Sequence, residues 1–264
     1  MQPYGAWRAT ADRVMILFNR DLLFVHNPKT AGTSMLHYLG EILPPPVHRA
    51  GVKEIGTNHP SLPQALDYAC AVADRRPGDF VRIIATVRNP FDREISMYRY
   101  FHDVLCRSPT VSRDLNDAAI EGAVGMAGRL DFSDYLAWVW RQFGTCDIWR
   151  SRCFYRTAQG RAPDNLRVIR TEHIEADLAA ALAGIAGLKN ASFPRLNVSD
   201  RTAGEPGFTD HTRSLVAQSY RWMVEDGIYP MESNRAAAHS SQSARREANA
   251  TARRPSPRWS APKS

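Results

Sequence analysis

The stretch FVHNPKTAGTS, from Phe24 to Ser34, decides how this chain is expected to fold. Its apolar start lies in the run DLLFVHN, residues 21–27, which indicates a buried strand that ends in a turn. Thr33 or Ser34 can then cap a helix that continues to about Ile42, before the prolines at 44–46 end it. The stretch therefore predicts a strand, a tight loop and a helix in direct succession.

Such a loop suits the binding of a phosphate. A helix start offers unpaired backbone N–H groups and the positive end of the helix dipole. Gly32 allows close approach of an anion, and Lys29 adds a charge. In the common nucleotide-binding loop G-x-x-x-x-G-K-[ST] the lysine follows the second glycine, whereas Lys29 precedes Gly32 by three residues. The alternative is an ordinary capped helix beside a surface lysine.

Outward from this stretch, predicted strands alternate with predicted helices. The remaining expected strands are residues 52–57, 80–89 and 165–172, and the clearest is FVRIIATVRN at 80–89. The expected helices after the first are 62–73 with Ser61 as N-cap, 91–105, 131–143, 173–188 and one long helix over 209–229. This alternation predicts an α/β fold with a central parallel sheet.

A second motif, VRNPFDREISMY at residues 87–98, supports an anion site. Arg88 ends the clearest strand, and Ser96 follows eight residues later on the next helix. Both can converge on one anion at the carboxyl edge of the sheet, where ligands bind in open α/β folds. The alternative is a structural ion pair between Arg88 and Asp92 or Glu94.

Together the two motifs resemble those of the PAPS-dependent sulfotransferases, most closely the carbohydrate branch that includes the heparan-sulfate 2-O-sulfotransferases. The matching segments are PKTAGTS at 28–34 and RNPFDREISMY at 88–98, with weaker likeness in RVIRTEHIEADL at 167–178 and FPRLNVSDR at 193–201. The resemblance covers roughly residues 20–230. It implies a P-loop-like three-layer α/β/α fold that binds PAPS and releases PAP, with no metal required.

The resemblance also implies roles for particular residues. The loop Lys29, Thr30, Ala31, Gly32, Thr33 and Ser34 would hold the 5′-phosphosulfate, with Lys29 on the leaving phosphate oxygen. Arg88 and Ser96 would hold the adenosine 3′-phosphate. The residues Arg195, Asn197, Ser199 and Arg201 would contact the adenosine or its 3′-phosphate, although a solvated polar loop is equally compatible with them.

The acceptor hydroxyl needs a general base, which is typically His or Glu. The family carries its catalytic histidine after the second strand, and His59 is at the corresponding place here. His48, another histidine or Glu172 are the alternatives, and His59 can also be structural. The aromatic residues in 134–149 can stack on sugar rings, but at helical spacing they are more often core.

The expected function is therefore sulfuryl transfer from PAPS to a hydroxyl of a carbohydrate or glycolipid. One alternative is a small-molecule kinase or NTPase of the same architecture, although no acidic residue is clearly placed for Mg²⁺. Another is a non-catalytic nucleotide-binding protein. The sequence leaves open the acceptor, the oligomeric state and the residues around the adenine.

Composition and charge limit the domain organisation, the partners and the location that are expected for the chain. The chain has 264 residues and a net charge of +7, of which residues 233–264 contribute +6. We therefore expect a sulfotransferase domain over 1–232 and a basic, Ser/Ala/Arg/Pro-rich disordered tail over 233–264, with a weak contact to membranes or polyanions as a further possibility for the tail. The near-neutral remainder disfavours nucleic acid as a partner. The four cysteines form no C-x-x-C pair, and no signal peptide or membrane-length apolar run is seen, so a cytoplasmic location is expected.

Overall fold

The structure is a computed structural model that describes residues 14–55, 59–106, 118–194 and 206–229. The chain divides into two compact units, Met1–Tyr220 and Arg221–Ser264, and each is considered by itself. The first unit contains the sheet and every described element mentioned below except the helix α10. The predicted boundary at 232/233 and the predicted tail lie outside the described residues.

The elements follow one another as strands and helices of ordinary length. The strands are β1 (Val14–Phe18), β2 (Leu22–Val25), β3 (His48–Gly51), β4 (Arg82–Val87) and β5 (Leu166–Arg170). The α-helices are α1 (Gly32–Ile42), α2 (Val52–Ile55), α3 (Leu62–Ala73), α4 (Pro90–Arg99), α6 (Ala118–Ala127), α7 (Phe132–Phe143), α8 (Ile174–Leu182), α9 (Asp210–Ser219) and α10 (Arg221–Glu225). Short 3₁₀ segments are η2 (Pro77–Asp79), η4 (Ser151–Phe154) and η5 (Thr171–His173), and η3 (Tyr100–Leu105) is a π-helix.

The sheet has five strands in the order β3-β1-β2-β4-β5. β2, β4 and β5 are parallel, as expected, but β1 pairs antiparallel with both β2 and β3. The fold class α/β is confirmed, whereas a wholly parallel sheet is not, because the sheet is mixed. The physical reason is the short connection Asn19–Asp21 between β1 and β2, which is long enough for a hairpin but too short for the crossover that parallel neighbours need.

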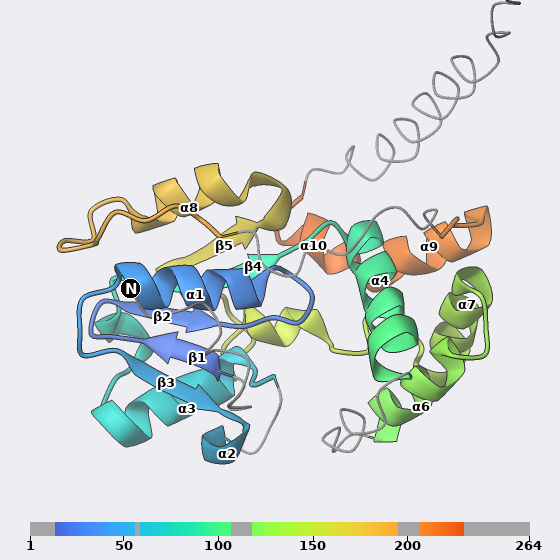
Figure 1. Ribbon diagram of the computed structural model, residues 1–264, viewed down its shortest axis with the longest axis horizontal. Coiled ribbons are helices and arrows are strands. Elements are labelled where there is room, and N and C mark those ends of the chain that lie inside the picture. The colour runs from blue at the N-terminus through green and yellow to red at the C-terminus, as the bar shows by residue number, and fades with distance from the viewer. Residues whose placement is uncertain (1–13, 56–58, 107–117, 195–205, 230–264) are drawn as a thin grey trace, which may run out of the picture. The chain divides into compact units, whose positions relative to one another are not determined.

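Helices cover both faces of the sheet, which is consistent with a three-layer α/β/α arrangement (Figure 1). On one face, α1 and α8 pack on buried side chains of four strands: Leu17, Leu22, Phe24, Ile84 and Ile169. On the other face lies α3, whose Tyr68 ring meets the edge of Phe18 at a centroid distance of 6.3 Å. Because β2 and β4 are covered on both faces, their side chains form nearly continuous apolar runs.

Two predicted elements are placed differently in the structure. Residues 52–55 form the helix α2 instead of a strand, and the edge strand is β3, four residues earlier. β3 is polar in sequence, but it needs an apolar residue on only one face, and Ala50 supplies it. The long helix expected over 209–229 is interrupted at Tyr220, which follows α9 and is the last residue of the first unit.

The parallel strands bring their carboxyl ends to one edge of the sheet. Val25 at the end of β2 is paired with Ala85 of β4, and Val87 at the end of β4 is paired with Arg170 at the end of β5. The segments that follow these strands therefore emerge side by side. The first two of them carry the motifs singled out in the sequence.

We expect Ile84→Ala to destabilise the first unit strongly. Ile84 is fully buried at the centre of β4 between α1 and α8, so truncation removes apolar contacts and leaves a cavity. The loss should be about 2–5 kcal/mol in the free energy of unfolding, measured by urea denaturation. Val81→Ala is the control, because Val81 is 42% exposed and its truncation should change that free energy little. Equal effects of the two substitutions would contradict this account of the core.

Candidate anion-binding site

The loop between β2 and α1 has an unusual backbone. Lys29 and Ala31 both adopt left-handed conformations, with φ of 63° and 60°. Such conformations are unfavourable for residues with a Cβ and persist where the surroundings impose them, often at functional sites. Alternating backbone hands also turn successive N–H groups toward one side, which creates a concave site for an anion.

Hydrogen bonds to β4 and to Tyr155 hold this loop in place. The Thr30 hydroxyl donates to the Asn27 carbonyl at 2.8 Å and shares a hydrogen bond of 2.7 Å with the hydroxyl of Thr86 on β4. The Asn27 amide donates to the Thr86 carbonyl at 3.2 Å and to the Tyr155 hydroxyl at 2.6 Å. The Thr30 hydroxyl therefore anchors the loop to the sheet, so its contribution to an anion would come from its backbone N–H.

A buried arginine supports the loop at Pro28, the residue after Asn27. Arg93 of α4 is fully buried, and its Nε donates to the Pro28 carbonyl at 3.3 Å. In a planar trans peptide the C=O and the following N–H point in opposite directions. With the Pro28 carbonyl turned toward Arg93, the N–H of Lys29 is turned away from that guanidinium.

The first turn of α1 completes the loop. The helix begins at Gly32, its N-cap is Ala31 without a side-chain capping bond, and Met35 N–H donates to the Ala31 carbonyl at 3.0 Å. The expected capping by Thr33 or Ser34 is therefore wrong, because the helix starts before either residue. Instead, the backbone N–H groups of residues 32–34 lie in the first turn, where an α-helix supplies no carbonyl partner.

Three positive side chains meet at this loop. Burial, followed by the positive charges of Arg88 and Arg93, lowers the pKa of Lys29 from 10.5 to about 8. The Lys29 ammonium also lies 4.2 Å from the ring centroid of Tyr100. Like charges repel one another, so this arrangement favours the binding of an anion near Lys29.

One face of α4 and its π-helical extension is turned toward the loop. Arg93 contacts Pro28, and Tyr100, seven residues later, contacts Lys29. Ser96 lies three residues after the first and four before the second, so it shares their face of the helix. Ser96 therefore lies on the face of α4 that contacts the loop, and Arg88 directly follows β4, from where its charge acts on Lys29.

His59 is connected to the loop by ring contacts. The His26 imidazole occupies the space where a Cβ on Gly32 would lie, so the position of His26 requires glycine there. The His59 ring meets His26 edge to face at a centroid distance of 5.4 Å, and it meets Trp149 in the same way at 4.8 Å. His59 is therefore close to the start of α1, although residues 52–55 of the strand expected before it form the helix α2.

The alternatives for a general base lie elsewhere or have structural contacts. His48 stacks on Phe18 at 4.7 Å, at the edge of the sheet where β2 begins, opposite the loop. Glu172 accepts a hydrogen bond of 2.5 Å from the backbone N–H of Asn89, which joins the ends of β4 and β5.

Four predicted ligand contacts lie outside the described residues. They are Arg195, Asn197, Ser199 and Arg201.

Three residues of the site had no role in the sequence-based prediction. Arg93 was part of a motif without an assigned contact, and Tyr100 lay beyond that motif. Trp149 belonged to an aromatic stretch for which both stacking on sugar rings and core packing were expected. Its indole N–H donates to the Met97 sulfur of α4 at 3.2 Å, and its ring packs on His59. The 3-and-4 spacing of Arg93, Ser96 and Tyr100 was the one signal in the sequence that they share a face.

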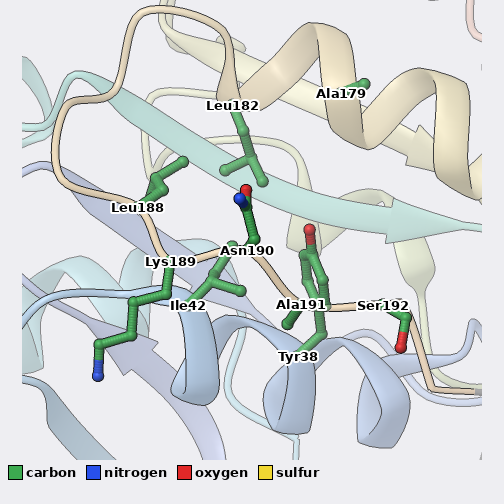
Figure 2. A pocket seen from close by; sticks show the side chains of 9 residues that line it. All are labelled: Tyr38, Ile42, Ala179, Leu182, Leu188, Lys189, Asn190, Ala191 and Ser192. Atoms are coloured by element: carbon green, nitrogen blue, oxygen red, sulfur yellow. The ribbon is translucent and has the colours of Figure 1, made fainter.

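A pocket of about 580 Å³ lies between α1, α8 and residues 188–192 (Figure 2). Its wall includes Tyr38 and Ile42 of α1 and Leu182 of α8. It contains none of the loop residues, because the length of α1 separates Ile42 from Gly32 by about 15 Å. We therefore assign the candidate site to the loop and not to this pocket.

The described residues contain no group of three or more His, Cys, Asp or Glu side chains placed to hold a metal ion. None of the helices in the described ranges has the length and apolarity needed to cross a membrane. No protein-family model, no curated protein and no solved structure matches the chain.

We expect Gly32→Ala to disrupt the loop. The new Cβ would overlap the His26 imidazole, so either that ring or the helix start must move. The free energy of unfolding should fall by about 1–3 kcal/mol, measured by urea denaturation. Gly78→Ala is the control, since a Cβ at Gly78 meets no atom within 4 Å in the described structure. A Gly32→Ala protein as stable as the control would show that His26 does not constrain this position.

Proposed function

We propose that this chain is a PAPS-dependent sulfotransferase with a P-loop-like nucleotide site. In this proposal the 5′-phosphosulfate lies on residues 29–34, and the adenosine 3′-phosphate lies on Arg88 and Ser96. The acceptor is a hydroxyl group of a carbohydrate or glycolipid. The sequence resemblance motivates the choice of PAPS, and the geometry of the loop supports the binding of a polyanion.

The observation that carries the proposal is the convergence of Lys29, Arg88 and Arg93 at the start of α1. Arg93 is neutralised in part by buried acids, since it lies 3.2 Å from Asp147 and 3.5 Å from Glu94. Burial and the positive charges of Arg88 and Arg93 disfavour the charge of Lys29, whereas the contact with the Tyr100 ring is attractive. A ligand with two separated anionic groups, as PAP has, would relieve this repulsion at more than one point.

The chemistry assigned to the site is an in-line displacement at sulfur. The acceptor oxygen forms a bond to sulfur while the bond between sulfur and the 5′-phosphate oxygen breaks, and PAP leaves with that electron pair. Lys29 and the backbone N–H groups of the loop stabilise the charge on the departing phosphate. His59 takes the proton of the acceptor hydroxyl. This division places the nucleotide over the loop and the acceptor toward His59 and Trp149.

The direct test is calorimetric titration of the protein with PAP in the presence of EDTA, in parallel with ATP and Mg²⁺. The proposal expects PAP to bind without metal and more tightly than ATP with Mg²⁺. The opposite preference would favour the kinase or NTPase alternative. Binding of PAP without turnover of PAPS on sugar, glycolipid and phenol acceptors would favour the non-catalytic alternative.

Arg88→Ala should weaken PAP binding by about 10- to 100-fold, the size expected for the loss of a hydrogen bond between charged groups. Adenosine 5′-monophosphate lacks the 3′-phosphate, so its affinity should change much less. Arg82→Ala is the matched control, because Arg82 lies at the opposite end of the same strand. If Arg88→Ala weakened both nucleotides equally, Arg88 would not be the 3′-phosphate contact.

His59→Ala should lower kcat for sulfuryl transfer by about 10²- to 10⁴-fold, the usual contribution of a general base. Its affinity for PAP should stay near that of the wild type, because His59 is assigned to the acceptor side. His48→Ala is the control and should leave kcat unchanged, since His48 lies at the other edge of the sheet. A wild-type kcat in His59→Ala would exclude His59 as the base, and lost PAP binding would move it to the nucleotide side.

A further inference from the structure

Tyr100 is the first residue of the π-helix η3, which continues α4. π-Helical turns are rare and are found frequently at functional sites. In this turn the N–H of Cys106 donates to the carbonyl of Phe101, five residues earlier, at 2.9 Å. The Phe101 side chain is fully buried, whereas Tyr100 is only partly buried and meets Lys29.

The contact between Lys29 and Tyr100 has the geometry of a cation–π interaction. The distance from Nζ to the ring centroid is 4.2 Å, well inside the range of about 6 Å in which such contacts are attractive. The left-handed backbone of Lys29 and the bond from Arg93 to Pro28 fix the direction from which the side chain leaves the loop. The loop thus fixes the backbone of Lys29, and the ring contact holds its ammonium at the other end of the side chain.

The other groups that act on Lys29 in the described part of the chain oppose its charge. Burial is the largest of them, followed by Arg88 at the end of β4 and Arg93 of α4. The negative face of the Tyr100 ring works in the other direction, because it attracts the ammonium but not the neutral amine.

We propose that Tyr100 is a positioning residue for Lys29, whose ring holds the ammonium charged and in place beside the start of α1 before an anion binds. The inference deepens the proposed function, on which the identity of the anion rests. Tyr100 lies outside the two sequence motifs that define the nucleotide site.

The titration of Lys29 in the ligand-free protein tests the proposal directly. The chain has only four lysines, Lys29, Lys53, Lys189 and Lys263, so labelling of lysine with ¹³C at Cε gives a spectrum of few signals. The signal of Lys29 is the one missing in Lys29→Gln. Its midpoint is then measured in the wild type, in Tyr100→Leu and in Tyr100→Phe.

Tyr100→Leu should lower the midpoint by about 0.5–1.5 pH units, since loss of the ring removes the group that favours the ammonium. Tyr100→Phe is the matched control: it keeps the ring face and should titrate like the wild type. A merely structural role for Tyr100 would not separate the two variants in this way. An unchanged or raised midpoint in Tyr100→Leu, or equal lowering in both variants, would overturn the proposal. If Tyr100→Leu does not melt cooperatively, Tyr100→Met replaces it. This variant has an unbranched apolar side chain without a ring, and the proposal again expects a Lys29 midpoint below that of Tyr100→Phe.

PAP binding provides a second readout. Because a charged Lys29 is needed for the phosphate, affinity should fall as pH rises through the Lys29 midpoint, and this fall should begin at lower pH in Tyr100→Leu than in Tyr100→Phe. Failure of the wild type to bind PAP would refute the proposed function, while the lysine titration would still decide the role of Tyr100. Binding of PAP with the same pH dependence in all three proteins would overturn the role of Tyr100 and leave the proposed function standing.

Discussion

The buried guanidinium of Arg93 is the interaction on which the loop and its surroundings depend. It donates to the Pro28 carbonyl on one side, and on the other it meets Asp147, Glu94 and the Tyr220 hydroxyl. Burial alone would lower the pKa of Arg93, but its neighbours raise it above its ordinary value, so the side chain stays charged. A buried charge is tolerated only when it is paired and hydrogen-bonded. One side chain thus ties the loop between β2 and α1 to α4, to the segment after α7 and to the end of α9.

The parts of the fold that were predictable are those in which local sequence and tertiary packing agree. β4 lies within the expected strand because its continuous apolar run is buried on both faces. The helix α3 spans the predicted residues, with the Gln64 side chain accepting a hydrogen bond of 2.8 Å from the N–H of the N-cap residue Ser61. The loop at Lys29 was also located correctly, since its chemistry is concentrated in one contiguous stretch.

Other features depend on contacts that a linear pattern does not contain. β3 is a strand because β1 pairs with it, although its sequence HRAG has little strand character. The start of α1 at Gly32 follows from the left-handed Ala31 and not from a capping side chain. The neighbours of His59 are residues 26 and 149, far from it in sequence, and its position follows from their ring contacts. The nucleotide and the acceptor remain predictions.

The cluster around Arg93 also contains a carboxyl group, Glu94, whose pKa is raised. Burial raises the pKa of Glu94 to about 7, against the opposing effect of Arg93. When Glu94 is protonated, the charges of Arg93 and Asp147 balance within the interior, and when it ionises the cluster carries one unit of excess negative charge. The unfolded carboxyl would titrate near its ordinary value of 4.5, so this contribution to folding stability is fully present below that pH and is lost as pH rises through about 7. The net charge of the buried cluster that holds the Pro28 carbonyl therefore changes by one unit near pH 7.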